Sequence, residues 1–257
     1  MSIQVTSETR LTIMSYNVLG GGLGAEPALA ATYDWYRLDE ILDFISDERP
    51  DILVVQEAFK WDVFMEDIVS SLEMPFHEHD EGGMLAIFSR YEIIEVEAWS
   101  HPFTNGVMRA AIRLPDGDTL HVFNAHLTPD LAESIGGSSD GLRLHETLRL
   151  IGLMEPYSNE LVILAGDLNF SAVKMLQCVR LGNACRGPFA ERAEPGKALL
   201  RADWDLVAYE DCSFGLEQVW VPSALRPIVQ ELQLGTESET LARLSDHLPI
   251  EIELAIE

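Results

Sequence analysis

Apolar residues recur along this chain in two patterns, and each pattern predicts a different kind of element. Short apolar or alternating runs bounded by turn residues predict β-strands. Such runs cover residues 11–18, 52–56, 84–89, 93–99, 108–114, 120–125, 161–165, 206–209, 228–232 and 248–256. Apolar residues at helical spacing predict helices over residues 35–48, 62–72 and 173–181, and a further helix through Leu144, Leu148 and Ile151.

The order of these elements mixes strands with helices along the whole chain. There is no internal repeat and no linker that would divide the sequence. In the last strand the apolar residues alternate with Glu251 and Glu253, which should face the other side. Residues 183–199, which include two prolines, are predicted to be irregular. Many short strands with interspersed helices favour an α/β fold of two packed sheets flanked by helices, in a single domain over residues 1–257.

Candidate chemistry begins at the strand of residues 161–165, which is apolar or small throughout and should be buried on both faces. Gly166 ends the run, and Asp167 and Asn169 follow two residues apart. Residues i and i+2 of an extended chain point to the same side. A carboxylate and an amide presented together could orient a water and hold a phosphoryl oxygen. The alternative is an ordinary turn, because Gly, Asp and Asn are common turn residues.

Other predicted strand ends carry polar side chains of a matching kind: Asn17, Glu57, His126 and the adjacent pair Asp246 and His247. Such clustering is expected when a rigid sheet supports a site on its loops. Glu57 follows an apolar strand, and a carboxylate there is a candidate ligand for Mg²⁺, which proteins hold with few carboxylates and several waters. The alternative is a solvated surface glutamate.

The two histidines have different support from the sequence. A single histidine at a strand end, such as His126, is more often structural than catalytic. His247 needs a carboxylate to set its tautomer and to support its charged form. Asp205, at the start of an apolar strand, is the preferred partner, and Asp203 is its rival.

The charge of the chain restricts its partners. Lys and Arg number 17 against 43 Asp and Glu, which gives a formal net charge of -26. Such a field repels polyanions, so long duplex nucleic acid is disfavoured, though not excluded, as a partner. Cys178, Cys185 and Cys212 lack metal-ligand spacing, and the chain shows neither a secretory signal nor an apolar run of membrane-span length. We expect reduced cysteines and a cytoplasmic location.

Five short motifs together resemble the endonuclease/exonuclease/phosphatase superfamily, which includes deoxyribonuclease-like and abasic endonuclease-like enzymes. The motifs are Ser15-Tyr16-Asn17, Gln56-Glu57, Asn124-Ala125-His126-Leu127-Thr128, Gly166-Asp167-Leu168-Asn169 and Ser245-Asp246-His247. They appear in the order that the superfamily shows. The resemblance implies a four-layer α/β sandwich and Mg²⁺-dependent phosphoester hydrolysis, with Mn²⁺ as a possible substitute.

The resemblance also implies a role for each matching residue. The implied metal ligands are Glu57, Asn17 and Asp246. Asp167 would orient or deprotonate water, and His126 would contact phosphate or assist the leaving group. The implied phosphate contacts are Asn169, Arg109 and His247, the last backed by Asp205.

Three functions remain open from the sequence. The favoured one is a phosphodiesterase acting on a small-molecule, nucleotide or lipid-headgroup phosphodiester. The main alternative is a DNA or RNA nuclease of the same superfamily. A non-catalytic binding protein on the same fold is a minor alternative, because fold does not imply function.

Overall fold

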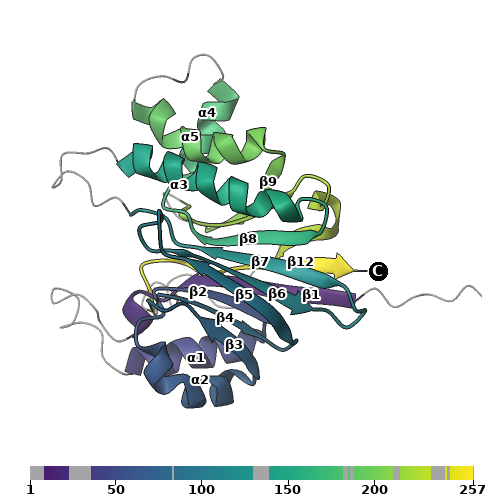
Figure 1. Cartoon of the computed structure of the whole chain (residues 1–257). Helices are drawn as coiled ribbons and strands as arrows, with labels where there is room; N and C mark the ends of the chain where they lie inside the picture. The colour runs from purple at the N-terminus through teal and green to yellow at the C-terminus, as the bar shows by residue number, and fades with distance from the viewer. Residues whose placement is uncertain are drawn as a thin grey trace, which may run out of the picture.

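Two six-stranded β-sheets pack face to face in this computed structural model, with helices on the outer face of each sheet (Figure 1). The structure describes residues 9–22, 36–82, 84–129, 139–181, 185, 188–210, 215–232, 241 and 244–256. The strand orders are β11-β12-β1-β2-β4-β3 and β5-β6-β7-β8-β10-β9. Each sheet mixes parallel and antiparallel pairs, so the predicted four-layer α/β sandwich is confirmed.

The first sheet brings the ends of its two central strands to one edge. It contains β1 (Thr9–Asn17), β2 (Ile52–Gln56), β3 (Phe76–His79), β4 (Leu85–Ser89), β11 (Val229–Leu232) and β12 (Ile250–Ile256). β1 and β2 are parallel, with Asn17 opposite Gln56, while β12 runs antiparallel to β1. The carboxyl ends of β1 and β2 therefore meet the segment that leads into β12.

The second sheet repeats this arrangement. It contains β5 (Ile93–Trp99), β6 (Val107–Arg113), β7 (Thr119–Ala125), β8 (Leu161–Asp167), β9 (Trp204–Tyr209) and β10 (Glu217–Pro222). β7 and β8 are parallel, and β10 is antiparallel to β8 with Glu217 opposite Asp167. The ends of β7 and β8 and the start of β10 thus share one edge.

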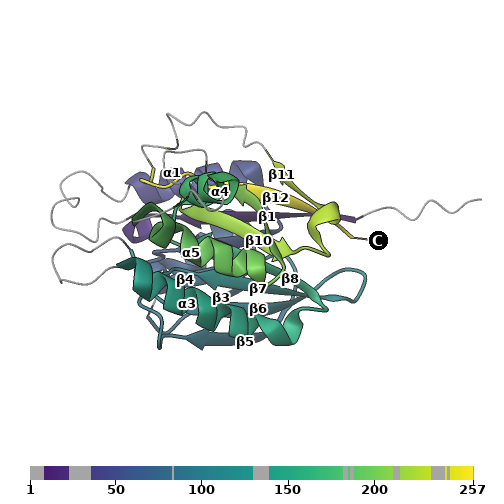
Figure 2. The same ribbon diagram turned by 90° about the horizontal axis from the view of Figure 1, so that it is seen from above.

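The helices bury the outer faces of the sheets. α1 (Tyr36–Glu48) and α2 (Met65–Leu72), with η1 (Gly20–Gly22) and η2 (Trp61–Phe64), lie against the first sheet. α3 (Ser139–Met154), α4 (Ala172–Leu181) and α5 (Pro188–Arg201) cover the second sheet (Figure 2), and the short helices η4 (Glu155–Tyr157) and η6 (Arg226–Ile228) are 3₁₀ turns. Alternate strand residues such as Ile13, Ile252 and Val122 fill the layer between the sheets. Three apolar layers therefore hold the sandwich together.

Residues 183–199 differ from their prediction. Instead of an irregular loop, α5 runs from Pro188 to Arg201 and contains Pro195. Proline removes a backbone donor and usually breaks a helix. Here Ala193 and Leu199 are fully buried, and α5 packs against both α3 and α4. Tertiary burial outweighs the local signal, as it often does for helix propensity.

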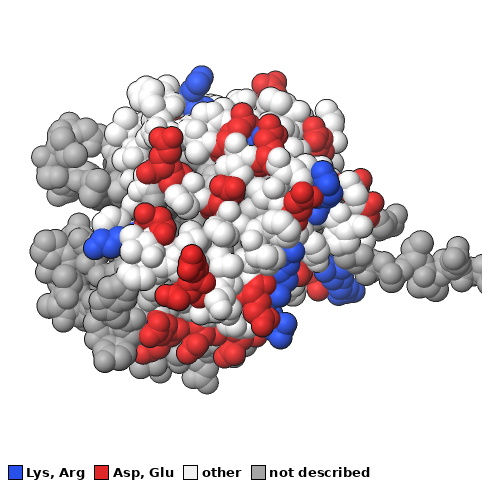
Figure 3. All heavy atoms as spheres, turned by 60° about the horizontal axis from the view of Figure 1, so that its bottom comes forward, with Lys and Arg blue, Asp and Glu red and all other residues white. Residues whose placement is uncertain are grey.

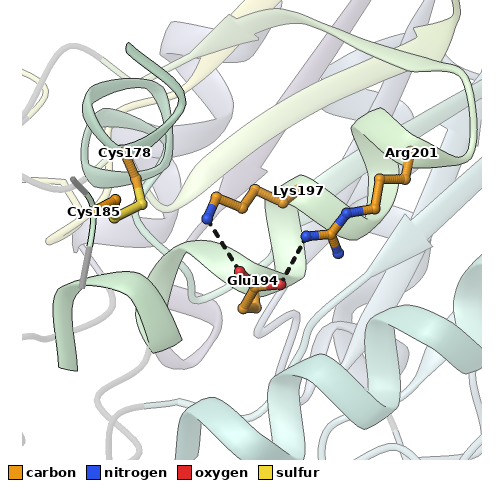
Figure 4. Close-up of a disulfide and its surroundings, with 5 residues drawn as sticks. All are labelled: Cys178, Cys185, Glu194, Lys197 and Arg201. Carbon is orange, nitrogen blue, oxygen red and sulfur yellow. Dashed lines mark hydrogen bonds and ion pairs between the residues drawn. A yellow bond between two sulfur atoms is a disulfide. The ribbon is translucent and has the colours of Figure 1, made fainter. Parts of the chain in front are cut away.

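Cysteine pairing also differs from its prediction. Cys178 of α4 and Cys185 form a disulfide (Figure 4), so the expectation of reduced thiols is wrong for this pair. Cys212 lies outside the described residues. The cytoplasmic location that was inferred from reduced cysteines stays a prediction. Among the described helices, none is long and apolar enough to cross a membrane.

One buried carboxylate in the first sheet links stability to pH. Glu251 lies on β12 opposite the apolar residues, as predicted, yet it is only 5% exposed. Burial, together with Glu48 and Asp51, raises the pKa of Glu251 from 4.5 to about 7. Between these two values the folded protein holds a proton that the unfolded chain has released. The free energy of unfolding therefore falls as pH rises through this window.

We expect Glu251→Gln to raise the melting temperature at about pH 8 and to change it little at about pH 5, because the neutral amide removes the buried charge. Calorimetry across this pH range measures the effect. Glu78→Gln, the same change at an exposed position of β3, is the control. An equal shift at both pH values would contradict the assignment.

Candidate active site

Strand ends from both sheets meet at one edge of the sandwich. Asn17 ends β1, Glu57 follows β2, and Asp167 ends β8. The Nδ2 atom of Asn17 lies 3.1 Å from Oε1 of Glu57 and 3.1 Å from Oδ2 of Asp167. Oε2 of Glu57 accepts a bond of 2.9 Å from the Gly20 amide. A single buried amide therefore joins carboxylates carried by different sheets.

Two imidazoles flank the buried carboxylate of Asp167, which is 1% exposed. The Nε2 atoms of His126 and of His247 each lie 3.5 Å from its Oδ2 atom. Nδ1 of His126 is buried and has no hydrogen-bond partner among the described residues. The structure thus brings together four predicted residues: Asn17, His126, Asp167 and His247.

Asn169 joins this group through a turn. β8 ends at Asp167, and Asn169 takes a left-handed backbone conformation with φ of 53°. The backbone N–H of Asn169 donates to Oδ1 of Asp167 at 2.9 Å, and the side-chain Nδ2 of Asn169 donates to the Leu127 carbonyl at 3.0 Å. The prediction from the spacing assumed an extended chain from Asp167 to Asn169, but β8 ends at Asp167. The backbone therefore follows the turn alternative. The side chain still lies beside Asp167.

Gly166 is required where β8 approaches β7. Its φ is 138°, and a Cβ atom there would lie 2.1 Å from the Ala125 carbonyl oxygen. Only glycine tolerates both constraints. This close approach sets Asp167 beside the residues that follow β7.

The carboxylate partner of His247 is Glu210, which corrects the prediction of Asp205 or Asp203. Oε2 of Glu210 lies 3.4 Å from Nδ1 of His247, an ion-pair distance that is longer than an ordinary hydrogen bond. Asp205 lies near the far end of β9, about 16 Å along the strand from Glu210. Backbone amides of Leu216 and Leu248 hold the Glu210 carboxylate at 2.8 and 3.2 Å.

The environment of His247 favours its protonated form. Burial alone would lower the pKa of this imidazole, but Glu210, Asp167 and Glu217 raise it to about 11. The ring therefore carries a positive charge at neutral pH. A protonated imidazole can donate a hydrogen bond from Nε2 while Nδ1 faces Glu210.

Glu217 is a component of the site that the sequence reasoning missed. It is fully buried at the start of β10, opposite Asp167, and accepts a hydrogen bond from Ser15. Burial and the nearby charge of Asp167 raise its pKa well above the ordinary glutamate value. The strand itself was not predicted, so no signal placed Glu217 near β8.

Arg109 does not reach this site, which corrects its predicted contact with phosphate. Its side chain is fully buried on β6, where Nη2 lies 2.6 Å from Glu95 and 2.8 Å from Glu97. Nη1 contacts Nδ1 of His121 at 2.9 Å, and the guanidinium lies over the Tyr157 ring. These partners occupy the guanidinium, so Arg109 stabilises the sheet beneath η4.

Glu57 and Asp246 present carboxylates at this edge, and carboxylate oxygens are the type of donor that a hard divalent cation takes. Although the Asp246 side chain reaches the surface, loss of solvation at its carboxyl group raises its pKa, and so do the charges of Glu57 and Asp167, against the opposing effect of His247. A cation would relieve this repulsion. No three His, Cys, Asp or Glu side chains of the described residues form a complete ligand set. Proteins usually hold Mg²⁺ with a few carboxylate oxygens, and water molecules complete its coordination shell.

The sandwich and its site define a class: an α/β fold that presents carboxylates, amides and imidazoles at the strand ends of two sheets. A family model described as Endonuclease/Exonuclease/phosphatase family matches residues 14–247. The chain belongs to this family, whose members are typically metal-dependent phosphoester hydrolases. No curated protein sequence matches the chain.

Solved structures with the same fold are distant in sequence. The human nocturnin catalytic domain with bound sulfate has a TM-score of 0.65 at 14% identity, covering 96% of this chain and 95% of that one. A mutant beta toxin from Staphylococcus aureus with bound magnesium ions gives 0.64 at 16% identity, covering 95% and 99%. D. rerio TDP2 complexed with single strand DNA product gives 0.62 at 15%, covering 96% and 98%. At such identities these structures support the fold alone.

In metal-free protein we expect the His247 ring to remain protonated well above neutral pH, because the surrounding carboxylates raise its pKa. Glu210→Gln should lower this pKa, whereas Asp205→Asn should leave it unchanged. Histidine ¹⁵N chemical shifts followed from about pH 6 to pH 10 distinguish the two variants. Titration of the wild-type ring near the ordinary value of about 6.5 would contradict the assignment.

Proposed function

We propose that this protein is a divalent-metal-dependent phosphodiesterase acting on a small-molecule, nucleotide or lipid-headgroup phosphodiester. The observation that carries the proposal is the buried Asp167 carboxylate, bonded to Asn17 and flanked by His126 and His247. Family membership supports the reaction class. A non-catalytic relative would be expected to have lost at least one of Glu57, Asp167, Asn169, Asp246 and His247, and all five are present.

Asp167 is the proposed water-orienting base. Its Oδ1 atom accepts a hydrogen bond from the backbone N–H of Asn169, while Oδ2 accepts one from Asn17 and lies near the two imidazoles. A carboxylate held in this way can orient an attacking water and accept its proton.

His247 is the proposed donor to the phosphoryl oxygen. Its ring holds a proton at neutral pH, and Glu210 supports the resulting charge. A charged donor fixed before the reaction stabilises the negative charge that grows in the transition state. Asn169 and His126 lie beside Asp167 and are proposed to contact the same phosphate group.

Glu57, Asn17 and Asp246 are the residues that would hold the metal ion, Mg²⁺ in our proposal, with Mn²⁺ as a substitute. When bound, the ion would supply Lewis acidity and orient the phosphoester. The carboxylate repulsion felt by Asp246 supports this choice of ligands. Magnesium ions are bound in the beta toxin structure, which has the same fold.

Glu57→Gln should lose most of its affinity for Mg²⁺ while the fold persists, because an amide replaces a charged ligand. Asp167→Asn and His247→Ala should each lower kcat by on the order of 10²-fold or more, with smaller changes in KM. Titration calorimetry with Mg²⁺ and hydrolysis of a chromogenic phosphodiester are the measurements.

Glu66→Gln, at an exposed position of α2, is the matched control for affinity and turnover. Unchanged Mg²⁺ affinity in Glu57→Gln would remove Glu57 from the metal site. A near-normal kcat in Asp167→Asn or His247→Ala would remove that residue from the mechanism. A wild-type protein that binds Mg²⁺ but cleaves no phosphoester would instead support the non-catalytic alternative.

Charge makes long duplex DNA an unfavourable substrate. Acidic side chains are spread over the described surface in Figure 3, with few basic ones between them. Affinity for duplex DNA comes from Lys and Arg that neutralise phosphates and release counterions. A net charge of -26 repels a polyanion and therefore disfavours duplex binding.

We expect kcat/KM for duplex oligonucleotides to be lower than for small phosphodiesters at both low and physiological salt. Parallel assays on duplex DNA, single-stranded DNA, RNA and lipid-headgroup diesters make the comparison. Efficient duplex cleavage that falls steeply with added salt would favour the nuclease alternative.

A further inference from the structure

A buried carboxylate on α3 contacts the segment that carries His126. The helix covers the outer face of the second sheet (Figure 2), and its residue Glu146 is 2% exposed. The Oε1 atom of Glu146 accepts hydrogen bonds from the backbone N–H of Thr104 at 2.7 Å and from the Thr104 hydroxyl at 2.9 Å. Its Oε2 atom accepts one from the backbone N–H of Thr128 at 2.8 Å. One carboxylate therefore joins the loop between β5 and β6 to the residues that follow β7.

These two stretches of chain are also bonded to each other. The hydroxyl oxygens of Thr104 and Thr128 lie 2.5 Å apart. Because the Thr104 hydroxyl already donates its one proton to Glu146, the Thr128 hydroxyl is the donor in this pair. The backbone N–H of His126 donates to the Gly106 carbonyl at 3.1 Å. The residues after β7 are thus fixed from two sides before any substrate binds.

The segment held in this way contacts the cluster around Asp167. The backbone N–H of Leu127 donates to the Asp167 carbonyl at 3.0 Å, and the Leu127 carbonyl accepts from Nδ2 of Asn169 at 3.0 Å. His126 precedes Leu127, and its Nε2 atom lies 3.5 Å from Oδ2 of Asp167. β7 ends at Ala125, so these residues lie beyond the strand. Glu146 therefore supports them where the strand no longer does.

We propose that Glu146 is a positioning residue for phosphoester hydrolysis and that it acts through His126. The inference rests on the proposed function, in which His126 contacts the phosphate group. A displacement of a reacting group by about 1 Å can lower a rate by about 10²-fold. Hydrogen bonds from a supporting residue prevent such displacement. The bonds of Glu146 go to Thr104 and Thr128, so its effect reaches the substrate through the imidazole that this segment carries.

Replacement of Glu146 tests this role. Glu146→Leu removes both acceptor oxygens, and kcat for a chromogenic phosphodiester should fall by about 10-fold or more, with a smaller change in KM. Glu146→Gln keeps one acceptor oxygen and should give a kcat between those of the leucine variant and the wild type. Glu155→Leu, the same change at an exposed position of η4, is the control and should leave kcat unchanged.

A double-mutant cycle distinguishes positioning from a general loss of structure. In a His126→Ala background, Glu146→Leu should lower kcat by less than about 2-fold further, because the imidazole that it positions is absent. A residue that only stabilises the fold would lower kcat by the same factor in both backgrounds. That result would overturn the proposal, and so would a normal kcat in Glu146→Leu alone.

A milder pair of variants decides the matter if Glu146→Leu does not fold. Thr104 lies at an exposed position of its loop. Thr104→Val removes the hydroxyl that donates to Glu146, and kcat should fall by about 3-fold or more, since a hydrogen bond contributes about 0.5–1.5 kcal/mol. Thr104→Ser keeps the hydroxyl and should have nearly normal kcat. Equal kcat values in the two variants would contradict the assignment.

The imidazole itself provides a test that does not depend on activity. In metal-free protein at neutral pH, the ¹⁵N resonances of the His126 ring should shift or broaden in Glu146→Leu and stay unchanged in Glu155→Leu. If the wild type hydrolyses no phosphodiester, the proposed function fails, and these resonances then decide whether Glu146 fixes His126. Identical His126 resonances in Glu146→Leu and wild type would overturn the inference whatever the activity.

Discussion

The geometry of the candidate site depends on buried hydrogen bonds between the two sheets, close to the edge of the sandwich where the site lies. Gln56 on β2 donates to Asn124 on β7 at 2.9 Å, and Asn124 donates to the Val55 and Ala86 carbonyls of the first sheet. The apolar layer between the sheets has no directional preference, so it cannot fix how they align. Sliding would leave these buried polar atoms unpaired, at a cost of about 1–3 kcal/mol each. The alignment that results holds Asn17 and Asp167, one from each sheet, within hydrogen-bond distance.

Much of the fold could be predicted because most strands carry a local signal. The strand Ile52–Gln56 was predicted from apolar spacing and is confirmed, as is the inward alternation of Ile250, Ile252, Leu254 and Ile256. Leu248 was predicted to face the same way, but it lies before β12 and packs against the helices of the first sheet. β10 was missed because it begins with Glu217 and Gln218, polar residues that are fully buried. Their burial follows from the pairing of β10 with β8 and β9, and the residues next to them in sequence give no pattern that predicts it. Local patterns thus fail where burial is imposed by distant parts of the chain.

The same limit explains which parts of the site could be predicted. Residues that end strands could be found, since an apolar run followed by a polar residue is visible in the sequence. The partner of His247 could not, because Glu210 and Asp205 lie at opposite ends of one strand and the choice depends on how that strand runs in the sheet. For Arg109 a usable signal existed. Glu95 and Glu97 lie two residues apart in the strand before that of Arg109, so both could face a basic residue of the neighbouring strand. In the structure Glu97 of β5 lies directly opposite Arg109 of β6.

The net charge of the chain affects a long polyanion more than a compact substrate. At physiological ionic strength charges on the surface are screened beyond about 8 Å. A small substrate in the site would therefore feel mainly the groups that it touches. A long nucleic acid would also lie over more of the surface of a chain that has 43 acidic and 17 basic residues. Each further contact with an acidic surface would then cost free energy, so the net charge of the chain disfavours a polymer more than a compact phosphoester.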